Sequence, residues 1–143
     1  MEMVTVSRVI EAPEPTVREW ITDAKPFMEG AGFDEVAVED DVMEITNSVG
    51  LLTIELTLRI LDTDGVLAYE QTDGIFEEME TRYTLEERGE GVEVTAVTEY
   101  ALDIDLVGSI LDGTIIARQR RKELNAQFDY LAERAREYES PAK

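Results

Sequence analysis

The sequence predicts an α+β fold: a strand, two short helices, an antiparallel meander of six strands and a long C-terminal helix. Two observations carry this prediction. Between residues 33 and 102, apolar and polar residues alternate in short segments, as in strands with one buried face. After Asp103 the apolar spacing changes to that of a helix and stays so almost to the end of the chain. The sheet is therefore expected to have about seven strands.

The first 33 residues are expected to hold one strand and two short helices. TVSRVIEA (residues 5–12) alternates as a strand does, and the segment APEP ends it. PTVREWI begins with a proline, which suits a first helical turn, and should be helical until Lys25 and Pro26 stop it. PFMEGAGF then forms a second short helical segment, closed by Gly30 and Gly32.

Six extended segments follow, and turn residues end each of them. In order they are FDEVAVE, VMEITN, LLTIELTLRIL, VLAYEQ, EEMETRYTLEE and VEVTAVTEYAL. The connections are short enough to be hairpins, which predicts that consecutive segments pair antiparallel.

The remaining stretch, from residue 105 to residue 138, is predicted to be one long helix of roughly 50 Å. Asp103 or Asp105 is a candidate N-cap. Gly108 and Gly113 each disfavour a helix interior by about 1 kcal/mol, so a kink or break near Gly113 is the alternative. A helix of this length has to lie across the sheet.

Composition excludes several classes of site. The chain of 143 residues has no cysteine and no histidine. Disulfides and thiolate metal sites are thereby excluded, and the commonest metal ligand and general base are absent. We expect neither a metal nor a cofactor. Length and an apolar content of 43% fit one domain over residues 1–140. No segment is long and apolar enough for a membrane helix, and the N-terminus lacks a signal-peptide pattern, so a cytoplasmic protein without membrane insertion is expected.

The formal net charge of −20 argues against nucleic acid or anionic lipid as a partner, because phosphates are repelled at long range. Lysine is scarce, with three residues (Lys25, Lys122 and Lys143) against ten arginines. Acid excess with few lysines resembles proteins of salt-loving archaea, whose concentrated cytoplasm screens self-repulsion. A cationic partner is the alternative, although the acids are scattered and form no block.

The order of elements resembles the START-like helix-grip superfamily, also called SRPBCC. VSRVIEAPEPTVREWITD resembles its first strand, Ala-Pro turn and first helix, and QFDYLAERA resembles the end of its last helix. GLLTIELTLRI, YEQTDGIFEEMETRYTLEE and LVGSILDGTIIARQRRKELNAQF look most like a branch from halophilic archaea. The resemblance covers nearly the whole chain. It implies a curved sheet wrapped around the last helix, with an apolar cavity between them.

Strand alternation assigns side chains to the two faces of the sheet. The inward set is mostly aliphatic, with sparse polar members: Asn47, Tyr69, Thr81, Tyr83, Thr98 and Tyr100. In VLAYEQ the phase is open, because either Leu67, Tyr69 and Gln71 or Val66, Ala68 and Glu70 face inward. An apolar pocket with a few convergent polar atoms is typical of small-ligand sites, whereas a filled core with satisfied hydroxyls is the alternative.

Candidate ligand-binding residues come from these strands, from the segment after the first helix and from the last helix. Phe27 and Met28 lie in a segment flanked by Gly30 and Gly32 at the expected mouth, and they form either a lid or ordinary packing. The full candidate set is Phe27, Met28, Met43, Asn47, Ile54, Leu56, Tyr69, Met79, Thr81, Tyr83, Thr98, Arg120, Arg121, Leu124 and Phe128.

The stretch RQRRKEL concentrates four cations at residues 118–122. An apolar stripe that includes Leu124 and Phe128 should pack on the sheet, and Arg120 and Arg121 flank it by about 50° on opposite sides. Both arginines are expected at the sheet rims, where they meet acidic strand residues. The alternative is that one of them caps the cavity mouth and holds a ligand carboxylate or phosphate.

Three functions remain open. Carriage of a small hydrophobic or amphiphilic ligand, such as a lipid, isoprenoid or polyketide-like molecule, is favoured. A cyclase or dehydratase needs an internal acid or base, and only Glu70 is a possible inward carboxylate on a strand, while Arg8 is the one inward strand cation. Tyrosines near their ordinary pKa of about 10 are poor bases, and no catalytic residue is assigned. The third function is an interaction module that holds a partner's apolar segment in the groove.

Overall fold

The computed structural model describes residues 2–102 and 113–139. Strand β1 (Glu2–Ile10) leads into two short helices, α1 (Glu14–Thr22) and α2 (Ala24–Glu29). Six strands follow in sequence, and the described chain ends in a long helix, α4 (Gly113–Glu139). The strands are β2 (Glu35–Glu39), β3 (Val42–Val49), β4 (Leu52–Ile60), β5 (Leu67–Asp73), β6 (Phe76–Arg88) and β7 (Gly91–Leu102). The predicted order of elements is confirmed.

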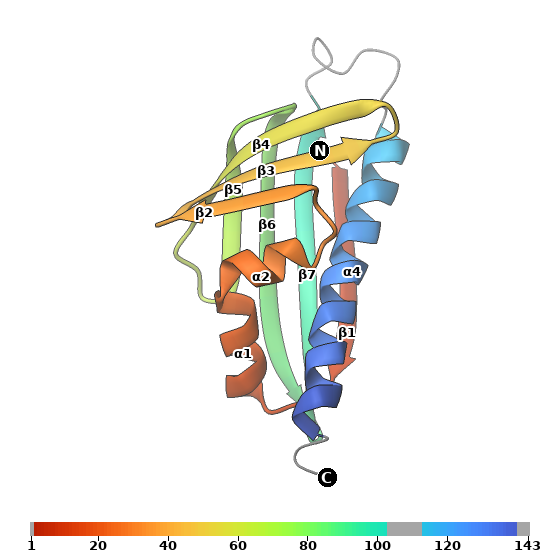
Figure 1. Cartoon of the computed structure of the whole chain (residues 1–143). Coiled ribbons are helices and arrows are strands. Elements are labelled where there is room, and N and C mark those ends of the chain that lie inside the picture. The colour runs from red at the N-terminus through yellow and green to blue at the C-terminus, as the bar shows by residue number, and fades with distance from the viewer. Residues whose placement is uncertain (1, 103–112, 140–143) are drawn as a thin grey trace.

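The strands form one antiparallel seven-stranded sheet in the order β1-β7-β6-β5-β4-β3-β2. The six later strands pair with their sequence neighbours, as hairpin connections require. Strand β1 breaks the sequence order, because it pairs with β7 from Glu2 opposite Tyr100 to Ile10 opposite Val92. This closing pair brings the N-terminal strand next to α4, and β2 to β4 run across one end of the longer strands (Figure 1).

The predicted faces of the sheet are correct. On β3 the side chains of Met43, Ile45 and Asn47 are buried, while the intervening Glu44 is exposed. On β7 every second residue from Val92 to Tyr100 is buried. On these two strands one face therefore meets the core, as the period of two requires.

Helix α4 packs across the inward face of the sheet and runs alongside β1 (Figure 1). Its described length of 27 residues corresponds to about 40 Å. The predicted N-caps, Asp103 and Asp105, and the helical stretch before Gly113 lie outside the described residues. Side chains of Leu124, Phe128 and Leu131 are completely buried, so the predicted apolar stripe does face the sheet.

Helix α2 lies beside α4 and covers the same face of the sheet (Figure 1). Phe27 and Met28 are completely buried, and the Phe27 ring lies edge-on to Tyr83 with 5.2 Å between ring centroids. Gly30 lies against Tyr130 of α4, and a Cβ at this position would come within 3.0 Å of the Tyr130 side chain, which is a tight contact. In this structure both side chains are packed in the interior, as the packing alternative expects.

Candidate functional site

The buried face of α4 carries polar as well as apolar side chains. Arg120, Glu123 and Gln127 are each less than 10% exposed, and they lie beside Leu124, Phe128 and Leu131. At about 100° per residue these side chains span roughly 140° around the helix axis. The centre of this arc is rotated by about 45° from the purely apolar stripe, toward Glu123. Arg120, Glu123 and Gln127 are therefore buried between α4 and the sheet.

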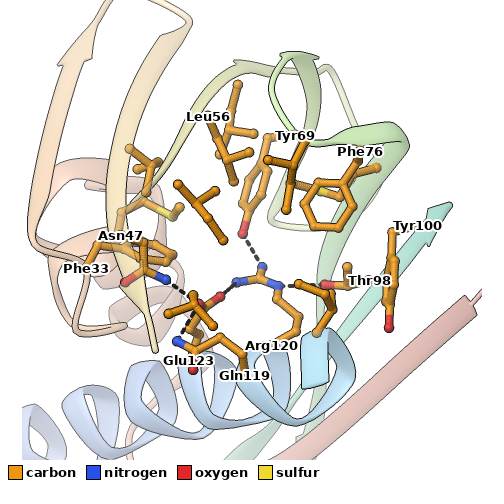
Figure 2. Close-up of a pocket in the computed structure, with 18 residues that line it drawn as sticks. Phe33, Asn47, Leu56, Tyr69, Phe76, Thr98, Tyr100, Gln119, Arg120 and Glu123 are labelled. Atoms are coloured by element: carbon orange, nitrogen blue, oxygen red, sulfur yellow. Dashed lines mark hydrogen bonds and ion pairs between the residues drawn. The ribbon is translucent and has the colours of Figure 1, made fainter. Parts of the chain in front are cut away.

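Arg120 is a buried cation with four hydrogen bonds to side chains. Its Nε donates to Thr98 Oγ1 at 3.0 Å, and its Nη2 donates to the Tyr69 hydroxyl and to Thr81 Oγ1. Its Nη1 donates to Glu123 Oε1 at 3.0 Å, which is also an ion pair. Three different strands and the next helical turn thus hold one guanidinium. Figure 2 shows its bonds to Tyr69, Thr98 and Glu123.

Glu123 is a buried carboxylate that accepts three hydrogen bonds. Besides Arg120, the Asn47 amide donates to its Oε2 at 2.8 Å, and the Gln119 amide donates to the same oxygen at 3.0 Å. The side chains of Arg120 and Glu123 are 9% and 10% exposed. A buried charge is tolerated only with such compensation, because removal from water costs several kcal/mol per ion.

A directed chain of hydrogen bonds leads from Arg120 to α2. The Tyr83 hydroxyl donates to Gln127 Oε1 at 2.6 Å, so its oxygen accepts from the Tyr69 hydroxyl at 3.1 Å. Tyr69 in turn accepts from Arg120, and the Gln127 amide donates to the Phe27 backbone carbonyl at 3.3 Å. This chain connects the cation to α2 through two phenols and one amide.

The two best-defined protonation states in this cluster are a charged guanidinium and a neutral phenol. Burial alone would lower the pKa of Arg120, but the oxygens of Tyr69, Tyr83 and Glu123 outweigh it and raise the pKa above its ordinary value. Burial, reinforced by Tyr69, raises the pKa of Tyr83 well above 10, and Arg120 only partly offsets this. Around neutral pH, Tyr83 therefore donates a hydrogen bond and is not a base.

The cluster lies at the wall of an apolar cavity of about 50 Å³. Such a volume admits a few water molecules, since one water needs roughly 10 to 15 Å³ on the same measure. Its wall combines aliphatic and aromatic side chains with the polar cluster: Met28, Phe33, Ile45, Asn47, Val49, Ile54, Leu56, Leu58, Tyr69, Ile75, Phe76, Met79, Thr98, Tyr100, Ile116, Gln119, Arg120 and Glu123. Figure 2 shows the polar groups near α4 and Leu56 and Phe76 across from them.

The structure brings about half of the predicted site residues to this wall. They are Met28, Asn47, Ile54, Leu56, Tyr69, Met79, Thr98 and Arg120. Thr81 and Tyr83 stand one step behind, where they bind the side chains of Arg120 and Tyr69. Phe27, Met43, Leu124 and Phe128 belong to the packed core, each with no exposed surface.

Arg120 does not lie where it was expected, and Arg121 does not contribute to the cavity as the candidate set expected. Arg120 lies inside the protein and pairs with an acid of its own helix, whereas a place at the rim with strand acids was expected. Arg121 is exposed and does not line the cavity. The physical reason is that Arg120 lies near the centre of the buried arc of α4, whereas Arg121 lies about 90° from that centre, just beyond the edge formed by Phe128.

On β5 the sequence left open whether Tyr69 or Glu70 faces inward, and the structure shows that Tyr69 does. Its hydroxyl reaches the polar cluster, whereas Glu70 points away and lies 3.6 Å from Arg59 at the surface. Arg8 does not reach the cavity, because it binds Asp129 of α4 at 2.5 Å and lies over the Phe128 ring. The internal carboxylate therefore comes from the helix, at Glu123.

Sequence reasoning missed Glu123, Gln119 and Gln127 as members of this site. A signal was present, because Ile116, Arg120, Glu123 and Gln127 follow each other at helical spacings of four, three and four. The inward polar positions on the strands required complementary partners, and this stripe supplies them. The predicted stripe was drawn through apolar residues such as Leu124 and Phe128 and did not include Glu123 or Gln127.

Within the described ranges no helix is long and apolar enough to cross a membrane. Among the same residues no group of three or more acidic side chains is arranged to hold a metal ion.

Comparison with known proteins places the fold. No family model matches the sequence, and no curated protein sequence matches it either. A START superfamily protein from Mycobacterium smegmatis superposes with a TM-score of 0.73 at 10% identity, over 95% of this chain and 98% of that one. The Zhui aromatase/cyclase from a Streptomyces species gives 0.74 at 17% identity, over 93% and 94%. A Thermus thermophilus protein gives 0.71 at 18% identity, over 94% and 97%.

These likenesses, together with the curved antiparallel sheet and its long terminal helix, define the architecture. The chain has the helix-grip fold, which it shares with a START superfamily protein and with an aromatase/cyclase. The identities are low, so the likeness extends to fold and not to activity.

Proposed function

We propose that this protein binds a small apolar or amphiphilic molecule in the cavity between the sheet and α4. The observation that carries the proposal is a single buried guanidinium at the wall of an otherwise largely apolar cavity. Apolar surface with a few converging polar groups is the usual composition of a small-molecule site. Arg120 orients the polar end of the ligand, and the aliphatic wall takes up the rest.

The ligand has to enlarge the cavity as it binds. A volume of about 50 Å³ lies well below the roughly 300 to 1,000 Å³ of sites for drug-sized ligands. Half-buried side chains on the wall, among them Leu56, Ile75 and Phe76, can move without exposing the inner core. Met28 and Met79 add adaptable surface, because thioether side chains repack easily. The competing hypothesis is a filled core in which the cluster only fastens α4.

Binding is favoured over catalysis by the state of the polar groups. Both oxygens of Glu123 accept hydrogen bonds from protein donors, so this carboxylate is not poised to remove a proton from a ligand. Tyr83 is neutral because burial raises its pKa. A cyclase or dehydratase requires an acid or base with a tuned pKa in contact with substrate, and the described wall supports neither role.

The test uses the neutral fluorescent probe N-phenyl-1-naphthylamine and a pair of matched variants on β4. Ile54→Phe adds a ring to the cavity wall, whereas Thr53→Phe adds the same ring to the exposed face. We expect the wild type and Thr53→Phe to bind the probe and Ile54→Phe to lose binding at least about tenfold. Native mass spectrometry of protein from its own host should show a bound small molecule. Absence of probe binding together with absence of a bound molecule would establish the filled-core hypothesis.

A further inference from the structure

The polar cluster around Arg120 and Glu123 carries no net charge. Among the described side chains of the cavity wall, only Arg120 and Glu123 are charged, and they neutralise each other at 3.0 Å. Both side chains are about nine-tenths buried, so solvent screens neither of them effectively. An anionic ligand head placed beside Arg120 would add a buried negative charge next to Glu123. Like charges in one buried site disfavour ionisation of both groups.

The supply of hydrogen-bond donors on Arg120 points to the same kind of ligand. A guanidinium has five N–H groups, and four of these are occupied by Thr98, Tyr69, Thr81 and Glu123. Within the described residues, only the second hydrogen on Nη1 has no acceptor. One N–H satisfies a single ligand oxygen, whereas the strong bidentate arrangement with a carboxylate uses two parallel N–H groups.

We infer that Glu123 is a specificity-determining residue that restricts the cavity to uncharged ligands with one hydrogen-bond-accepting oxygen, such as an amide or ketone carbonyl. This inference rests on the proposed function, because it names the class of molecule that binds at the same site. Glu123 acts by holding the charge of Arg120, which leaves the guanidinium free to donate but not to serve as a net cation. A carboxylate ligand would have to displace Glu123, whose Asn47 and Gln119 donors hold it in place.

The matched ligands are straight-chain alkanamides and alkanoates of equal length, from six to twelve carbons. Members of each pair have nearly the same shape and differ by one charge at pH 8. Binding is measured by isothermal titration calorimetry and by saturation-transfer NMR on the full chain. In the wild type we expect the amide to bind at least about tenfold more tightly than the alkanoate of the same length.

The variant Glu123→Gln removes the charge of Glu123 and keeps its size. The Asn47 and Gln119 amides can rotate to offer their oxygens to the new amide, so the variant should remain folded. We expect the preference to reverse, with alkanoates gaining at least about tenfold relative to amides. Glu137→Gln is the control, since it removes one charge from an exposed position of the same helix and should leave the preference unchanged. Salt at about 1 M, where the Debye length is about 3 Å, removes general repulsion by the acidic surface and should preserve the preference.

The outcomes separate the inference from the function beneath it. Wild-type protein that binds alkanoates as tightly as amides would overturn the inference and leave the proposed binding function standing. A Glu123→Gln variant that is folded by circular dichroism and keeps the amide preference would do the same. If neither series binds at any length, nor the fluorescent probe, the proposed function fails and the inference fails with it. The wild-type comparison needs no variant, so it decides the question even if Glu123→Gln does not fold.

Discussion

Replacing Arg120 by methionine tests whether this buried arginine, with its hydrogen bonds to three strands, is the main polar attachment of α4 to the sheet. Methionine keeps much of the side-chain volume and removes the charge together with four hydrogen bonds. Glu123 is then left as a buried carboxylate with the Asn47 and Gln119 donors only. Removing one partner of a buried pair typically costs about 3 to 5 kcal/mol, because the other charge stays uncompensated.

The structure places the expected cost at the lower end of this range. At 3.0 Å and an effective dielectric constant of about 20, two unit charges attract each other by roughly 5.5 kcal/mol, and desolvation cancels much of this gain. The two amide donors that remain stabilise the Glu123 carboxylate in part. We therefore expect Arg120→Met to lower the free energy of unfolding by about 3 kcal/mol, out of a total of roughly 5 to 15 kcal/mol for a domain.

The assay is urea-induced unfolding at fixed ionic strength, followed by circular dichroism and by the fluorescence of Trp20, the single tryptophan. Arg121→Met is the matched control, because it makes the same change at the adjacent exposed position and should stay within about 0.5 kcal/mol of wild type. The double variant Arg120→Met with Glu123→Leu removes both charges and should recover most of the loss. A loss below about 1 kcal/mol in the single variant, or no recovery in the double variant, would refute the reasoning.

Two further predictions concern pH and core packing. The pKa of Tyr83 is raised in the folded state, so unfolded chains lose this proton first above about pH 10 and the free energy of unfolding falls as pH rises from there. Urea titrations between pH 9 and 11 should show a shallower decline for Tyr83→Phe than for the wild type, and an equal decline would contradict the raised pKa. Leu124→Ala leaves a cavity at a completely buried position of α4 and should lower the free energy of unfolding by about 3 kcal/mol. Leu51→Ala at a fully exposed hairpin tip should lower it by less than about 0.5 kcal/mol, and equal losses in urea unfolding would contradict the packing described for α4.

The faces of the strands were predictable because the period of two is a geometric property of a strand and needs no knowledge of its partners. Met43, Ile45 and Asn47 are buried as alternation requires. Segment ends were predictable for a similar local reason, since turns such as Asp40 and Asp41 carry their own signals. Asp40 adopts a positive φ of 55°, which aspartate tolerates better than most residues.

Which side of α4 faces the sheet was predictable only in part, because a helix lacks the strict two-residue alternation of a strand. A stripe drawn through apolar residues alone, such as Leu124 and Phe128, ignores polar residues that are buried with partners. The partners of Arg120 and Glu123 lie on strands between 22 and 76 residues away. Which strand positions meet which helical turn depends on how α4 crosses the sheet, and no local pattern encodes that crossing.

The cluster also explains how a chain with a net charge of −20 uses one of its few cations. Arg120 contacts β5, β6 and β7, Glu123 contacts β3, and Gln127 contacts α2 through the Phe27 carbonyl. Rotating α4 by one residue would move the cation by about 100° and break all of these bonds together. An apolar stripe alone tolerates small rotations, since dispersion contacts are not directional.

A ligand that binds under α4 therefore meets one rigid and one adaptable wall. Shifting α4 would break the hydrogen bonds that Arg120 and Glu123 make to the strands at a cost of several kcal/mol, which exceeds what a small ligand can readily supply. Space is more easily made on the opposite side, where Leu56, Ile75 and Phe76 are only half-buried and each movement costs a few dispersion contacts. The cavity should thus open toward β4, β5 and β6, and the polar cluster should keep the same geometry in the free and the bound protein.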